Sequence, residues 1–139
     1  MSLPQTTAIL AGNDVNNATI PGDEATLDIE WQMAISTEID TYFWSVKIGY
    51  LLEWAQQLLS ATTTPLVNSI SYGGNESNSP LSYKNRCDQE FQKLAAIGVS
   101  VVVSSGDAGA TNIGHGSESC DLLEPQYPAA SPYVTSVSK

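Results

Sequence analysis

Three acidic residues, Glu24, Asp28 and Asp107, have a type and spacing suited to chemistry. Glu24 and Asp28 are four residues apart, so on a helix their carboxylates project from one face. Two neighbouring carboxylates resist both ionising, and a pair used together can therefore hold and pass on a proton. The alternative is that both acids lie solvated on the outer face of a helix.

Asp107 follows a short apolar run, Val101-Val102-Val103, that ends in small residues and two glycines. A β-branched run of this kind predicts a strand buried on both faces of a parallel sheet. In open α/β sheets, binding and chemistry occur at the carboxyl ends of the strands, which is where Asp107 falls. The alternative is a turn aspartate that hydrogen-bonds its own backbone.

The order of elements around these acids predicts an α/β fold. Helices are expected over 23–36, 47–60 and 80–97, with Ser79 as the cap of the third. Strands are expected over 6–11, 39–44, 66–72, 99–104 and 133–137. Strands that alternate with helices predict a parallel sheet flanked by helices. In the first helix, an apolar stripe is formed by Leu27, Trp31, Ala34 and Ile35. The segment 110–132 is too long for a plain connection and is expected to be functional or mobile.

Composition narrows the classes of partner. The 139 residues amount to one domain, and fifteen acids against five bases give a net charge of −10. Such a surface repels nucleic acid and anionic membranes and suits an acidic compartment. The alternative is that the negative charge serves only to keep the protein soluble. No apolar run approaches the ~20 residues of a membrane span. Residues 1–20 lack the pattern of a signal peptide, so none is expected in this chain.

Cysteines and sequons mark candidate sites of modification, which apply if the chain is secreted. Cys87 and Cys120 could form one disulfide that closes a loop of ~33 residues, or Cys120 could pair with a cysteine outside this chain. Asn17 and Asn75 each begin an Asn-x-Ser/Thr sequon and are glycosylation candidates. Neither cysteine lies in a C-x-x-C pair and His115 stands alone, which argues against a zinc site.

Four segments, in order and with matching spacing, resemble the motif blocks of the sedolisins, which are serine-carboxyl peptidases. They are residues 22–29 (GDEATLDI), 68–73 (NSISYG), 104–109 (SSGDAG) and 127–137 (YPAASPYVTSV). The resemblance implies a subtilisin-like α/β fold and cleavage of peptide bonds at acidic pH. It also implies that residues 1–139 are a partial catalytic domain, incomplete without the remainder of that domain.

The resemblance also implies roles for individual residues. Glu24 resembles the general base beside the nucleophilic serine, Asp28 the acid that orients it, and Asp107 the oxyanion-hole acid. Ionised Glu24 would accept the serine proton, and protonated Asp107 would donate a hydrogen bond to the developing oxyanion. The same blocks imply four substrate-binding positions, namely Ser71, Gly73, Ser105 and Gly106.

The chain departs from the sedolisin pattern in what it lacks. It contains no Gly-Thr-Ser-x-x-Ser block for the nucleophile, no Asp-rich calcium site and no propeptide. The chain alone is therefore expected to be inactive and to hold no cofactor, although the complete family domain binds calcium. Its expected partner is a peptide or protein substrate, and its expected location is extracellular, lysosomal or vacuolar.

Three alternatives remain open at this point. The parent could be an endopeptidase or a tripeptidyl-peptidase, because much of the substrate pocket lies outside the four blocks. The chain could also be a non-catalytic α/β binding module derived from the same fold. A nucleotide-binding protein that uses residues 105–109 is a more distant reading, because G-x-G-x-x-G and a P-loop lysine are absent.

Overall fold

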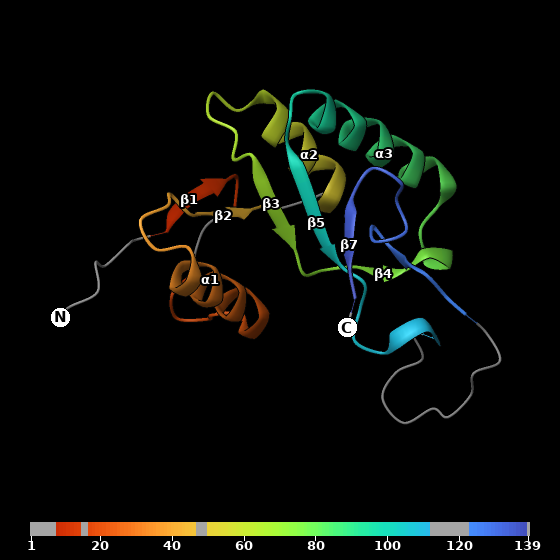
Figure 1. Cartoon of the computed structure of the whole chain (residues 1–139), viewed down its shortest axis with the longest axis horizontal. Coiled ribbons are helices and arrows are strands. Elements are labelled where there is room, and N and C mark those ends of the chain that lie inside the picture. The colour runs from red at the N-terminus through yellow and green to blue at the C-terminus, as the bar shows by residue number, and fades with distance from the viewer. Residues whose placement is uncertain (1–7, 15–16, 47–49, 112–122, 139) are drawn as a thin grey trace. The chain divides into compact units, whose positions relative to one another are not determined.

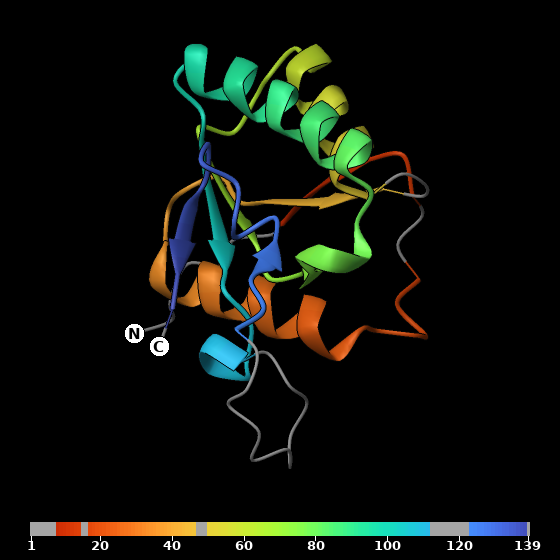
Figure 2. The ribbon, with the colours of Figure 1, turned by 90° about the vertical axis from the view of Figure 1, so that its right-hand side faces the viewer.

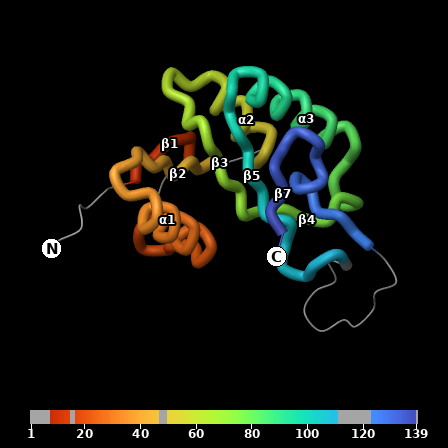
Figure 3. The backbone as a smooth tube through the Cα atoms, viewed as in Figure 1, coloured from red at the N-terminus to blue at the C-terminus, as the bar shows by residue number. Residues whose placement is uncertain are grey.

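The structure, a computed structural model, describes residues 8–14, 17–46, 50–111 and 123–138. The chain divides into two compact units, Met1–Gln57 and Leu58–Lys139. The first contains β1 (Ile9–Gly12), α1 (Asp23–Ile35) and β2 (Tyr42–Ser45), and α2 (Tyr50–Ser60) runs from the first unit into the second. Figure 1 shows these elements along the chain, and Figure 3 follows the same path as a continuous trace.

The first unit is built on a parallel strand pair. Strands β1 and β2 pair in the register Ile9↔Tyr42 to Gly12↔Ser45, and α1 lies on the connection between them. Gly12 has a φ of +93°, and a Cβ atom there would lie 1.9 Å from the Ser45 carbonyl oxygen. Only glycine therefore allows β1 to turn away at this point.

The apolar stripe of α1 is not buried. Leu27, Trp31 and Ile35 are 50%, 62% and 76% exposed, and none of the helix's 13 residues, all of them described, is buried. A different row, Ala25, Ile29 and Met33, is half-buried. Residues four apart share a face, so this second row is the more covered side of α1.

The second unit contains a three-stranded parallel sheet in the order β3-β5-β7. The strands are β3 (Val67–Ile70), β5 (Ser100–Ser104) and β7 (Thr135–Val137), and α3 (Leu81–Ala96) packs against β5. Figure 2 shows β5 beside β7, both pointing the same way. The α/β class with a parallel sheet, predicted from the alternation of elements, is confirmed.

Burial on β5 is stronger on one face than on the other. Val101 and Val103 are 4% and 0% exposed, whereas Val102 between them is only half-buried. Side chains alternate along a strand, so Val101 and Val103 share a face. The prediction of a strand buried on both faces is therefore only half right. The core of this unit also contains the fully buried side chains of Cys87, Phe91 and Leu94 from α3.

The N-terminal end of α3 differs from the prediction. The N-cap position is Pro80 rather than Ser79, and no side chain caps the helix. The Ser79 amide instead donates to the Glu76 carbonyl in the 3₁₀ turn η1 (Glu76–Asn78). At the other end Gly98, with φ +84°, allows Val99 N to bond back to Leu94 O at 2.9 Å.

A short antiparallel pair was not predicted from the sequence. Strand β4 (Gly74–Asn75) pairs with β6 (Gln126–Tyr127), and a second 3₁₀ turn, η2 (Gly109–Thr111), follows β5. The pairing places residues after β3 beside residues just before β7. Within the described ranges, no helix is both long and apolar enough to cross a membrane.

Candidate functional site

The carboxyl ends of β3 and β5 form the candidate site of the second unit. The two strands are parallel neighbours, so the residues that follow them lie at the same edge of the sheet. Ser71 and Gly73 follow β3, and Ser105 to Asp107 follow β5. The predicted position of Asp107, at a strand end, therefore agrees with the structure.

The turn that carries Asp107 is held by its backbone. The amide of Ser105 donates to the Val137 carbonyl at 2.9 Å, so the exit of β5 stays attached to β7. Gly106 then adopts a φ of +95°, in the left-handed region that favours glycine, and the Asp107 residue is exposed. The Asp107 residue is therefore accessible to solvent at this edge of the sheet.

Gln126 lies beside this edge of the sheet and was not predicted to do so from the sequence. A Cβ atom at Gly106 would lie 2.6 Å from Nε2 of Gln126, and one at Gly73 would lie 3.4 Å from its Oε1. The side-chain amide of one residue on β6 therefore lies against both predicted substrate-binding glycines. No pattern in the sequence indicates this contact, because it depends on the unpredicted pairing of β4 with β6.

An open hollow of about 260 Å³ adjoins the same edge. Its polar lining includes Ser105, Glu124, Gln126 and Ser136. Small and apolar residues such as Pro125 and Ala129 line it as well, so the hollow is of mixed character. Of the four predicted substrate-binding residues, Ser105 lines this hollow.

Glu24 and Asp28 lie on α1 in the first unit. Glu24 is in the first turn and is exposed, and Asp28, one turn later, is half-buried. The four-residue spacing places both carboxyl groups on one face of the helix. Because Asp107 belongs to the second unit, the grouping of all three acids into one site stays a prediction.

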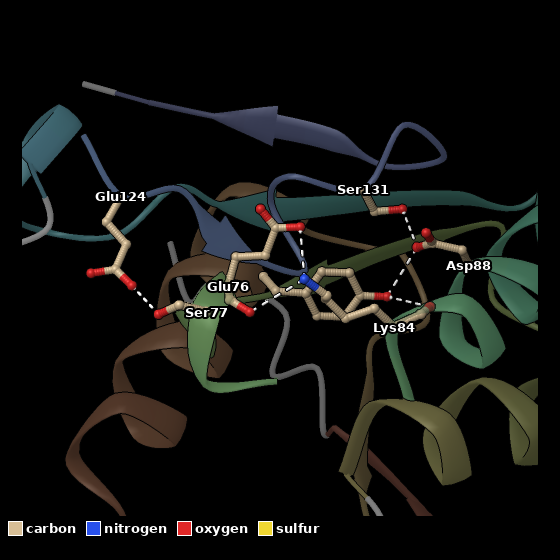
Figure 4. A network of polar contacts seen from close by, with 7 residues as sticks. Glu76, Ser77, Lys84, Asp88, Glu124 and Ser131 are labelled. Atoms are coloured by element: carbon tan, nitrogen blue, oxygen red, sulfur yellow. Dashed lines mark hydrogen bonds and ion pairs between the residues drawn. The ribbon is translucent and has the colours of Figure 1, made fainter. Parts of the chain in front are cut away.

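A polar network beside the edge joins α3 to the chain around β6 (Figure 4). Oδ1 of Asp88 accepts the hydroxyl of Tyr127 at 2.9 Å and that of Ser131 at 2.7 Å. The Tyr127 hydroxyl also lies 3.1 Å from the Lys84 carbonyl oxygen, and Lys84 Nζ pairs with Glu76 Oε1 at 3.1 Å. Burial, followed by the Asp88 hydrogen bond, raises the pKa of Tyr127 well above its ordinary value.

Glu124 forms a second anchor at the end of the segment that follows Asp107. Its carboxylate accepts the Asn75 side-chain amide at 2.9 Å and also the Ser77 hydroxyl. Backbone bonds reinforce the anchor, since Glu76 N donates to Pro125 O at 2.9 Å and Glu124 N donates to Ala110 O at 3.3 Å. The chain at Ala110 is thus hydrogen-bonded to the chain at Glu124.

The two glycosylation candidates have different surroundings. Asn17 lies in an exposed turn in which Thr19 donates to Asn17 Oδ1 through its amide at 3.1 Å and its hydroxyl at 2.7 Å. Asn75 is half-buried, and both polar side chains of its sequon contact Glu124. Occupancy of either site stays a prediction.

Of the two cysteines, the structure describes Cys87 but not Cys120. Cys87 is fully buried with a free thiol, and burial raises its pKa, although hydrogen bonds with Tyr83 and Tyr127 counter part of that rise. Cys120 and His115 lie outside the described residues, so the proposed Cys87–Cys120 disulfide stays a prediction. Among the residues that the structure does describe, no three acidic, histidine or cysteine side chains group as metal ligands.

Comparison with known proteins identifies relatives of the chain. It is 42% identical to tripeptidyl-peptidase 1 of Dictyostelium discoideum over 84% of its length, and 36% identical to tripeptidyl-peptidase 1 of Canis lupus familiaris over the same share. It is 32% identical to tripeptidyl-peptidase SED4 of Arthroderma otae over 94% of its length. These relatives are sedolisins. The chain is a sedolisin homologue.

The match covers only part of each relative. This sedolisin homologue spans 20% of the Dictyostelium protein, 21% of the canine protein and 25% of the Arthroderma protein. No protein-family model matches the chain. The resemblance seen in the four sequence motifs is confirmed by these relatives, whereas the activity of a complete protein is a separate question.

Proposed function

We propose that this chain is a segment of a serine-carboxyl peptidase that acts at acidic pH and has a subtilisin-like catalytic domain. The observation that carries the proposal is the identity to tripeptidyl-peptidases over most of the chain. The parallel sheet supports it, because Asp107 follows the central strand at the edge where such sheets bind ligands.

In the proposed mechanism, Glu24 is the general base. It takes the proton of a serine hydroxyl as that oxygen attacks the carbonyl carbon of the scissile peptide bond, and later returns the proton to the leaving amine. Asp28, one helical turn away, hydrogen-bonds to Glu24 and orients it. Asp107 in its protonated form donates a hydrogen bond to the oxyanion of the tetrahedral intermediate.

Acidic pH reconciles the demands on these carboxyl groups. Glu24 has to be ionised to accept a proton, whereas Asp107 has to be protonated to donate one, and an ionised Asp107 would repel the oxyanion. The excess of acids over bases in the chain supports an acidic compartment, either extracellular or lysosomal and vacuolar. No nucleic acid or membrane partner is proposed.

The nucleophile has to come from the remainder of the catalytic domain. Ser104 and Ser105 follow the Val101–Val103 run and match the strand-end motif rather than a nucleophile turn. The chain alone is therefore proposed to be inactive. The calcium that the resemblance implies for the complete family domain is proposed to bind in the remainder of that domain, so no residue of this chain is given a role in holding it.

The proposed substrate is a peptide or protein. Ser71, Gly73, Ser105 and Gly106 surround the edge that carries Asp107, and the hollow beside it has hydroxyl, amide and carboxylate groups. These groups can hydrogen-bond the amides and carbonyls of an extended peptide. The names of the relatives favour removal of tripeptides over internal cleavage.

The test uses the complete protein in which these 139 residues occur. Peptide hydrolysis is measured from acidic to neutral pH with a free N-terminal tripeptide reporter and with an internally quenched peptide. Glu24→Ala and Asp107→Ala are each expected to lower kcat about a hundredfold or more. Glu30→Ala, on an exposed site of the same helix, is the matched control and should leave kcat unchanged.

Two results would overturn the proposal. A complete protein that binds peptides but hydrolyses none at any pH would indicate a binding module. Full activity of the Asp107→Ala protein would show that its oxyanion role is wrong.

A further inference from the structure

Gln126 places its side-chain amide against the turns that follow two neighbouring strands. We propose that Gln126 is a positioning residue that holds the Gly106 turn, and with it Asp107, in place for catalysis. The inference rests on the proposed function, since it concerns the orientation of the proposed oxyanion acid. It goes beyond that function because the four sedolisin-like motifs assign no role to position 126.

The backbone of Gln126 is fixed on both sides. It stands opposite Asn75 in the antiparallel pair of β4 and β6, and its carbonyl oxygen accepts the Ala130 amide at 2.7 Å. The next residue, Tyr127, is 4% exposed and hydrogen-bonds to Asp88 on α3. The point at which the side chain leaves the backbone is therefore defined.

The end of this side chain fills the space above Gly106. A Cβ atom at Gly106 would come within 2.6 Å of Nε2 and 2.7 Å of Cδ of Gln126, which is closer than real carbon atoms approach. The φ of +95° by itself favours glycine at 106, and without a Cβ atom there the end of the Gln126 side chain can lie against the turn. The side chain therefore occupies the space into which the turn would move toward β6.

The same amide limits the neighbouring turn. A Cβ atom at Gly73 would lie 3.4 Å from Oε1 of Gln126, 3.0 Å from the Tyr127 carbonyl oxygen and 3.6 Å from Cδ of Pro128. Gly73 and Gly106 thus both lie close to the end of one side chain. A shortened side chain at 126 would leave a gap between the two turns, which a packed structure resists only in part.

The consequence for catalysis concerns the residue after Gly106. A hydrogen-bond donor for an oxyanion acts only when it is held within a few tenths of an ångström of its place, and a shift of about 1 Å can cost a hundredfold in rate. Because Gln126 restrains the Cα that precedes Asp107, its loss is expected to lower kcat. Gln126 also lines the hollow beside this edge, so its loss can change substrate affinity as well, and kcat together with the resonances of the turns tests the positioning role.

The first experiment tests the contact of Gln126 with the two turns without measuring enzyme activity. In the complete protein labelled with ¹⁵N, Gln126→Ala is expected to shift the amide resonances of Gly73, Gly106 and Asp107. Gln92→Ala, at an exposed glutamine on α3, is the matched control and should leave those three resonances in place. Unchanged resonances in the folded Gln126→Ala protein would overturn the inference, whatever the enzyme does.

The second experiment reads kcat and KM separately. Gln126→Ala is expected to lower kcat about tenfold or more, whatever its effect on KM, and Gln126→Met, which keeps the length of the side chain, should restore most of kcat. A fall in kcat for Met as large as for Ala, in proteins with the same melting temperature, would contradict the steric role. Absence of hydrolysis in the unmodified protein would refute the proposed function, and the resonances would still decide the contact.

Discussion

The hydroxyl of Tyr127 on β6 donates a 2.9 Å hydrogen bond to Oδ1 of Asp88 on α3. Ser131 donates to the same oxygen at 2.7 Å, so one carboxylate holds two residues of the segment that leads into β7. Tyr127 and Ser131 are 4% and 6% exposed. The anchor therefore lies mostly out of water, where a lost partner is costly.

Replacing Tyr127 by phenylalanine should destabilise the protein. The change removes one bond to a carboxylate and keeps the ring, so the free energy of unfolding should fall by about 1.5–3 kcal/mol. Urea denaturation followed by tryptophan fluorescence measures this. Tyr133→Phe, at a residue that is 42% exposed, is the control and should change stability by less than about 0.5 kcal/mol. Equal effects of the two changes would contradict the importance of the Asp88 bond.

Stability should fall in alkaline solution. Burial raises the pKa of both Tyr127 and Cys87, whose ordinary values are 10.0 and 9.0. Above those values the unfolded chain releases protons that the folded chain keeps, so the stability that is full below them is lost as pH rises. Each group adds a slope of up to about 1.4 kcal/mol per pH unit. Urea midpoints at about pH 8 and about pH 10.5 test this, and Tyr127→Phe should flatten the decline.

The Glu124 anchor should be sensitive to charge at Asn75. Asn75→Asp replaces an amide donor with a second carboxylate against Glu124, and a half-buried like-charge pair is expected to destabilise the protein at neutral pH. Asn17→Asp is the matched control, because the Thr19 amide and hydroxyl can donate to either side chain. The difference in melting temperature should shrink at acidic pH as one carboxyl takes a proton. A melting temperature equal to that of Asn17→Asp at neutral pH would show that the anchor is dispensable.

Peptide mapping under non-reducing conditions tests the cysteines. A Cys87–Cys120 disulfide would close a loop of ~33 residues and add about 3–4 kcal/mol, largely by restricting the unfolded chain. In the reduced protein, the fully buried Cys87 thiol should react with a thiol reagent only on unfolding. Recovery of Cys120 joined to any other cysteine would eliminate the proposed pair.

The sequence was informative where local pattern decides the structure. The helix predicted over 23–36 is α1 (Asp23–Ile35), and the strand predicted over 99–104 is β5 (Ser100–Ser104). In each of these two segments, the residue types and their spacing favour a single kind of secondary structure. The apolar stripe of α1 failed as a guide to burial, because periodicity identifies an apolar face without naming what covers it.

Only those residues of the candidate site that are placed by a local sequence pattern could be predicted. Asp107 could be placed at a strand end, since a buried run followed by glycines is a local signal. Gln126 could not, because its contacts with Gly73 and Gly106 arise from a two-residue strand pair between segments about fifty residues apart. Pairings that short leave no recognisable pattern in the residues that make them.

The position of β5 between β3 and β7 has a consequence for the nascent chain. About thirty residues separate Ser104 from Thr135, which at 5–20 residues per second is on the order of two to six seconds of translation. Throughout that interval the Val101–Val103 run can pair with β3 but still offers an open, β-branched edge on its other side. Until β7 is delivered, this edge is therefore exposed to pairing with another strand.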